Sequence, residues 1–187
     1  MAKLGVPHSE TTRRFPTGHR QEARAPQLRR NGQGVKRRVL VCGDRNWLDV
    51  GPIRKDLLDL GDQIEILVDG AAKGADTIGY IVGHDDLGLS NDRLRRFHAD
   101  WSKYHQAAGP IRNREMLKFL REAPPDVIPL VFAYHNNLME SRGTADMYVI
   151  ADDAGIEVRL FPEQEFDKKL WLQMKKVRSK SYEKKTS

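Results

Sequence analysis

The chain has little cysteine and no long apolar run. Its 187 residues include one cysteine, Cys42, which excludes a disulfide within the chain and a zinc site built on several cysteines. Cys42 lies in an apolar segment, so we expect a small buried thiol rather than a nucleophile. No apolar stretch approaches the ~20 residues of a membrane helix, and the first residues lack the apolar part of a secretory signal. We therefore expect a cytoplasmic protein with no membrane partner.

The net charge of +6 conceals a change of sign along the chain. Residues 1–38 carry +8 and residues 165–187 carry +5, whereas residues 39–164 carry −7. Basic ends attract nucleic acid or other acidic partners through charge alone. Solvated tails that only keep the protein soluble are the alternative, and Phe15 is the one aromatic residue in the N-terminal tail on which a base can stack.

The length predicts one domain with appendages. Residues 1–36 are rich in Arg, Gly, Pro, Gln and Thr without an apolar period, which is typical of a disordered tail. Residues 37–162 predict the folded domain, and residues 163–187 predict a basic helix that packs on the domain or meets a partner. The apolar stripe of this helix comprises Phe166, Leu170, Met174 and Val177, with Trp171 beside it.

Between the tails, short apolar segments alternate with segments of helical period, which predicts an α/β fold. We expect a Rossmann-like parallel sheet of about five strands with helices on both faces. The polar stretch 84–92 predicts an irregular loop, and Pro129 indicates an edge strand or a strand start. Strands are expected at 38–42, 64–68, 94–98, 127–133 and 156–161, and helices at 50–60, from about 76 to 82, from 110 to before 124, and from 141 to Gly155.

The turn Asp69–Asp76, between the second expected strand and helix, is the most informative stretch. Gly70 and Gly74 allow a sharp bend and leave backbone amides bare. Bare amides at the positive end of a helix dipole suit a phosphate group. A plain tight turn without a ligand is the alternative.

Two further helix starts are candidates for anion binding. Arg112, Asn113 and Arg114 fall in the first turn of a helix expected from Pro110, where positive charges oppose the dipole. Such a cluster requires an anionic partner, which is either a ligand or a structural ion pair. The segment Ser141–Thr144 opens the next helix with small hydroxylated and glycine residues, and it forms another possible phosphate cradle.

Taken together, these motifs resemble the SLOG superfamily of Rossmann-like proteins, in particular its branch related to YspA and YpsA. The resemblance rests on Gly43-Asp44-Arg45, Gly70–Asp76, Gly109–Met116 and Ser141–Met147, and it covers about residues 38–161. It implies a protein that binds a nucleotide or nucleotide-derived ligand as a sensor or nucleotide-processing protein, without a metal or other cofactor. Related proteins often self-associate, so we expect a homo-oligomer. The expected ligand-binding residues are Gly43, Asp44, Arg45, Gly70, Ala71, Lys73, Gly74, Ala75, Asp76, Arg112, Asn113, Ser141, Gly143 and Thr144.

The superfamily leaves two other functions open. LOG phosphoribohydrolases pair an Arg-x-x-x-Met segment with a Gly-Thr-x-x-Glu turn, whose arginine and glutamate act on an N-glycosidic bond. Here Met147 replaces that glutamate, and the neighbouring Asp146 is expected to point elsewhere, because consecutive helical residues are ~100° apart. A hydrolase of nucleoside monophosphates would use Arg112 with Asp76 or Asp146. A protein similar to DprA would instead bind nucleic acid through its basic tails.

Overall fold

The structure is a computed structural model of the full chain, which describes the backbone of residues 34–183 and the side chains up to residue 177. The chain divides into two units at Asn31, and the second unit, Gly32–Ser187, is the one described below. Most of the expected N-terminal tail lies outside the described residues. Among the helices described, none is long and apolar enough to cross a membrane.

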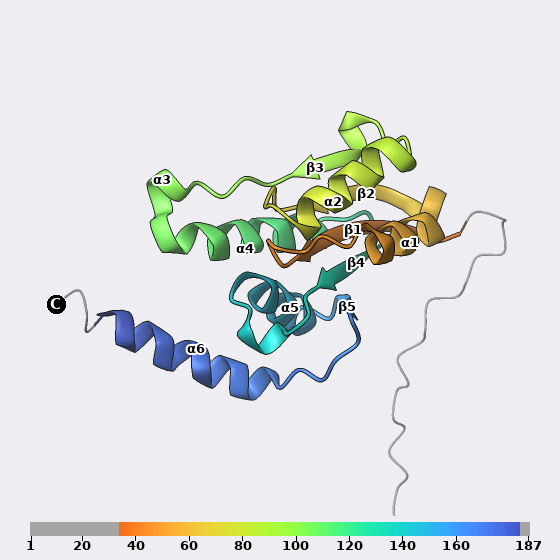
Figure 1. The fold of residues 1–187 in the computed structure, drawn as a ribbon. Coiled ribbons are helices and arrows are strands. Elements are labelled where there is room, and N and C mark those ends of the chain that lie inside the picture. The colour runs from red at the N-terminus through yellow and green to blue at the C-terminus, as the bar shows by residue number, and fades with distance from the viewer. Residues whose placement is uncertain (1–33, 184–187) are drawn as a thin grey trace, which may run out of the picture. The chain divides into compact units, whose positions relative to one another are not determined.

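A five-stranded parallel sheet forms the centre of the second unit, in the order β3-β2-β1-β4-β5 (Figure 1). This confirms the predicted α/β, Rossmann-like fold. The strands are β1 (Lys36–Gly43), β2 (Ile64–Asp69), β3 (Leu94–Arg96), β4 (Val127–Tyr134) and β5 (Glu157–Phe161). The helices are α1 (Val50–Leu60), α2 (Ala75–Ile81), α3 (Trp101–Tyr104), α4 (Ala108–Arg121), α5 (Gly143–Asp153) and α6 (Lys168–Glu183).

The sheet is covered on both faces, as its central strand shows. Side chains alternate along β1, so Val39 and Val41 pack in one cluster while Leu40 and Cys42 pack in another. The first cluster includes residues of α1 and α2, and the second includes residues of α4 and α5. Burial on both faces explains why β1 is a continuous apolar run rather than an alternating one.

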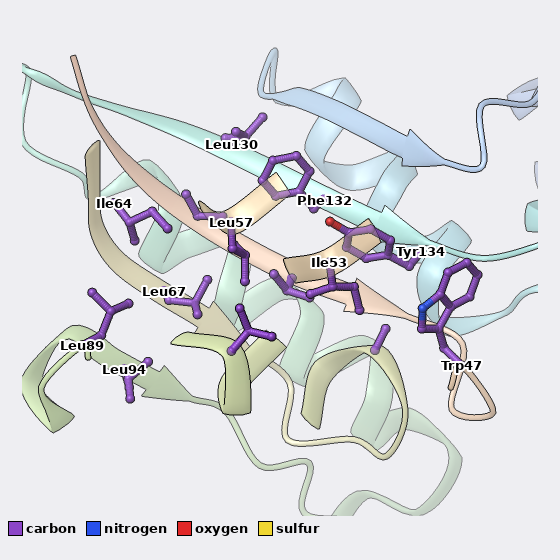
Figure 2. Close-up of a cluster of buried hydrophobic side chains, with 14 residues drawn as sticks. Trp47, Ile53, Leu57, Ile64, Leu67, Leu89, Leu94, Leu130, Phe132 and Tyr134 are labelled. Carbon is purple, nitrogen blue, oxygen red and sulfur yellow. The ribbon is translucent and has the colours of Figure 1, made fainter. Parts of the chain in front are cut away.

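The cluster under α1 also fixes the turn that follows β1 (Figure 2). Trp47, at the end of this turn, packs against Tyr134 at the end of β4, with 5.9 Å between the ring centroids. The Tyr134 hydroxyl donates a 2.8 Å hydrogen bond to Asp56 of α1. Residues 43–46 are therefore anchored at the carboxyl edge of β1 and β4.

Two expectations for local structure need correction. The stretch 84–92 is partly helical, because a π-helical turn, Val82–Asp86, continues α2 and a 3₁₀ turn follows at Asn91–Arg93. Leu87 and Leu89 lie within this polar stretch and pack into the core, which local composition concealed. Pro129 does not mark an edge strand, since β4 lies between β1 and β5. It lies near the start of β4, and pairing with β5 begins one residue later.

Candidate functional site

The turns that follow β1, β2 and β4 meet at the carboxyl edge of the sheet and enclose a cleft of ≈ 770 Å³, named here the main cleft. It lies beside the gap between β1 and β4, where the direction of strand order reverses, and such crevices bind ligands in open α/β sheets. A side hollow of ≈ 460 Å³ adjoins it. The two share Arg45, Ala72, Trp101 and Arg112.

The main cleft gathers much of the expected site. It is lined by Gly43, Asp44, Arg45, Asp76, Arg112, Asn113, Ser141, Gly143 and Thr144. The expected residues Gly70, Ala71 and Lys73 line the side hollow. Gly74 and Ala75 line neither of them.

A glycine is required at position 74 because the turn after β2 lies close against the turn after β1 there. Its φ of 70° is a left-handed conformation, and a Cβ atom there would overlap the backbone of Asp44 and Arg45. The Ala75 amide donates a 3.2 Å hydrogen bond to the Asp44 carbonyl. A bulky residue at Gly74 is therefore expected to disturb the fold itself.

Asp76 binds two of the backbone amides that we expected to bind a phosphate. Its Oδ2 accepts hydrogen bonds from the amides of Gly70 (3.0 Å) and Ala72 (3.4 Å), and the residue is 2% exposed. Burial raises the pKa of Asp76 to about 6, although the Arg112 guanidinium and the two amides act in the opposite direction. The turn thus already holds an internal carboxylate where we expected a ligand phosphate.

The position of Arg112 also differs from expectation. Because α4 begins at Ala108, Arg112 is the fifth residue of the helix and not part of its first turn. Its Nη1 donates to the Gly70 carbonyl and lies 3.9 Å from Asp76 Oδ2, and its Nη2 donates to Asn113 Oδ1 at 3.1 Å. The structural ion pair is therefore present. The buried Nε of Arg112 has no acceptor among the described residues.

A chain of polar contacts continues from Arg112 across the floor of the main cleft. The buried Asn113 donates to the Gly143 carbonyl and to Asp146 Oδ2, both at 3.1 Å. Lys175 of α6 donates to Asp146 Oδ1 at 2.5 Å. Residues from α2, α4, α5 and α6 are thus connected in one network.

Asp146 lines the main cleft, which corrects the expectation that it points elsewhere. It is 3% exposed, and its carboxylate is held by α4 on one side and α6 on the other. The adjacent Met147 also reaches the cleft, but it packs in the core cluster with Met116. Both residues reach the cleft because it extends over the first turn of α5.

The start of α5 is only partly open to a ligand. The Ser141 hydroxyl accepts from the amides of Thr144 (3.0 Å) and Ala145 (3.4 Å), so it caps the helix itself. At Gly143, by contrast, an added Cβ would meet no atom within 4 Å. Gly143 is therefore the cleft glycine with free space beside its backbone.

Several lining residues were missed from the sequence. Trp101 is 49% exposed, and the Arg45 guanidinium lies 5.4 Å from its ring centroid. Trp171 and Lys175 come from α6, where their four-residue spacing places them on one helix face. That spacing is the signal that the sequence offered. The other lining residues that were not predicted are Cys42, Asn46, Ala72, Gln106, Gly109, Pro110, Arg142 and Met147 in the main cleft, and His98 and Ala99 in the side hollow.

Helix α6 packs on the domain, but through a different face than expected. Trp171 is 2% exposed and its indole nitrogen donates to the Ser141 carbonyl at 2.9 Å, whereas Leu170 and Val177 are 46% and 68% exposed. Helix α6 lies beside the main cleft because Trp171 binds Ser141, just before α5, and Lys175 binds Asp146, in the first turn of α5. The predicted apolar stripe is therefore wrong for Leu170 and Val177, whereas Phe166 packs as expected, against Tyr148 and Trp171.

Cys42 lines the main cleft but is 6% exposed, so the expected burial of its thiol is confirmed, and this burial raises the pKa of the thiol. Among the described residues, no three His, Cys, Asp or Glu side chains form a group that could hold a metal ion.

Comparison with known proteins finds no matching family model, no matching curated protein and no matching solved structure. The likeness to the SLOG superfamily therefore rests on the four sequence motifs. The fold and the cleft define the chain as a Rossmann-like protein with a crevice at its strand-order reversal.

Proposed function

We propose that the main cleft binds a nucleotide or nucleotide-derived ligand, so that the protein acts as a sensor or a nucleotide-processing protein. The observation that carries this proposal is the meeting of three strand-to-helix turns around one cleft at the β1–β4 reversal. The volume of ≈ 770 Å³ is in the range of small-molecule sites.

The lining supplies groups for each part of such a ligand. Arg45 and Arg112 offer guanidinium groups to phosphate oxygens. The half-exposed ring of Trp101 offers a flat apolar surface to a base. Asp146 and Asn113 offer hydrogen-bonding atoms to ribose hydroxyls or base edges.

Arg45 gives the cleanest test because it lines both spaces and is not part of the network around Arg112. Calorimetric titration with nucleosides and their mono-, di- and triphosphates should give saturable binding of at least one phosphorylated member. Arg45→Ala should weaken this binding at least tenfold. The matched control is Arg54→Ala on α1, an exposed arginine paired with Asp86, which should leave binding unchanged. Equal affinity in both variants would reject the proposal.

One observation favours N-glycosidic hydrolysis as a second function. Asp146 is a carboxylate in the main cleft, and Asp76 with its raised pKa lines the same space, so an acid is present despite Met147. Release of free base from nucleoside monophosphates, lost in Asp146→Asn, is the expected result for this function. No free base with any of the four common nucleoside monophosphates would exclude it for those substrates.

A further inference from the structure

The side hollow differs from the main cleft in the charge of its lining. The main cleft is lined by Asp44, Asp76 and Asp146 together with basic residues. The side hollow has no carboxylate in its lining. Its charged or titratable lining residues are Arg45, Lys73, His98 and Arg112. A negatively charged group in the hollow therefore meets these basic residues in its lining, although the buried Asp76 binds the amides of Gly70 and Ala72 in its wall.

Two of these cations lack a carboxylate partner within the described part of the chain. No hydrogen bond or ion pair joins the Lys73 side chain to a described residue, and the Arg45 side chain contacts the Trp101 ring. Other cations of the domain, such as Arg37, Arg38 and Arg96, are paired with acids. Lys73 and Arg45 therefore bring positive charge to the hollow that no described carboxylate pairs, whereas Arg112 is paired with Asp76.

Arg112 lies at the boundary between the two spaces and has one unsatisfied donor. Its Nε is buried without an acceptor among the described residues, which is unfavourable for a charged group. Its other two nitrogens are held by Gly70 and Asn113. Because Nε is buried, an anionic oxygen completes its hydrogen bonding only if the Arg112 side chain shifts as the ligand enters.

We propose that the side hollow is a phosphate subsite, and that the ligand carries two phosphates in series, as a nucleoside diphosphate or an ester of one. The first phosphate lies at the shared wall of Arg45 and Arg112, and the second enters the hollow towards Lys73 and His98. The nucleoside lies in the main cleft beside its carboxylates. This inference rests on the proposed nucleotide binding and names the class of ligand.

The test compares mono- and diphosphates of adenosine, guanosine, cytidine and uridine by calorimetric titration of the full-length protein. For at least one base, the diphosphate should bind at least tenfold more tightly than the monophosphate. Lys73→Ala should reduce this advantage about three- to tenfold and leave monophosphate affinity unchanged. Lys55→Ala, which removes an exposed lysine from α1, is the matched control and should behave as wild type.

The outcomes separate this inference from the proposed function. If a monophosphate binds and its diphosphate binds no more tightly, the phosphate subsite is rejected while nucleotide binding stands. The same conclusion follows if Lys73→Ala weakens both ligands equally. If no nucleotide binds, both proposals are rejected.

Discussion

At the scale of single residues, Arg112 has a structural role whether or not a ligand is present. It is the guanidinium closest to the buried carboxylate of Asp76, and it also binds Gly70 and Asn113. Arg112→Ala should therefore destabilise the empty protein by on the order of 3 kcal/mol in urea unfolding at pH 7.5, because a buried charge loses its partner.

The matched control for this prediction is Arg54→Ala, whose ion pair is exposed and should contribute under about 1 kcal/mol. A neutral or stabilising effect of Arg112→Ala would instead support the first-turn placement that the sequence predicted. That placement failed because α4 begins two residues before Pro110, at Ala108, and local sequence gives no N-cap residue to mark this start.

The raised pKa of Asp76 should make the protein less stable as pH rises from about 4 to above 6. Its pKa is raised from 3.8 to about 6, so the folded protein binds more protons than the unfolded chain between these values. Its contribution to the free energy of unfolding is therefore fully present below about pH 4 and is lost as pH rises through 6. Asp69 is shifted in the same direction, also by burial, and it remains in the variant below.

Asp76→Asn should remove this contribution to the pH dependence. The asparagine oxygen can still accept from the amides of Gly70 and Ala72, so the turn is retained. Urea unfolding from pH 4 to pH 7 should show a smaller decrease in stability for the variant than for wild type. Parallel curves for the two proteins would contradict the raised pKa.

At the scale of elements, α6 is part of the folded domain through Trp171. Trp171→Ala should destabilise by about 3–5 kcal/mol, since it removes a buried ring and leaves the Ser141 carbonyl without its donor. Leu170→Ala, on the exposed side of α6, should change the free energy of unfolding by less than about 1 kcal/mol. Thermal or urea unfolding distinguishes this packing from the stripe predicted by helical period, for which Leu170 would be the costlier change.

Alanine should have opposite effects on stability and binding at two glycines of these turns. Gly143→Ala should leave stability within about 0.5 kcal/mol of wild type, because there is free space at its Cβ position, yet it should weaken nucleotide binding if a ligand approaches the backbone. Gly74→Ala should destabilise by about 2 kcal/mol or more, because of its φ of 70° and the adjacent loop. Full nucleotide affinity in Gly143→Ala would show that no ligand approaches there.

The elements themselves were largely predictable from sequence, whereas the partners of the site residues were not. The apolar period of β1, β2 and β4 and the glycines after α1 and α5 located the strands and helix ends correctly. The carboxylate of Asp76 binds amides in its own turn, and Lys175 reaches Asp146 from 29 residues away. Such contacts depend on how elements pack, and no local pattern specifies them.

At the scale of the whole molecule, the helices that cover the sheet and the main cleft at its carboxyl edge occupy different parts of the folded unit. Packing of α1 and α2 on one face and of α4 and α5 on the other leaves the carboxyl edge of β1 and β4 for the main cleft. The expected nucleic-acid contacts of the N-terminal tail involve residues that lie mostly outside the described part of the chain. The proposed nucleotide binding and the predicted contacts of the N-terminal tail therefore involve different segments, so experiment can separate them.

Hydrogen exchange of the full-length protein, with and without a saturating nucleotide, would show whether the nucleotide binds in the main cleft. We expect slower exchange in the turns that line this cleft, at residues 43–46, 109–113 and 142–146, and no change in α1. Protection confined to residues 1–33 or 178–187, with the cleft turns unaffected, would rule out binding in the cleft and would locate it in the basic ends instead.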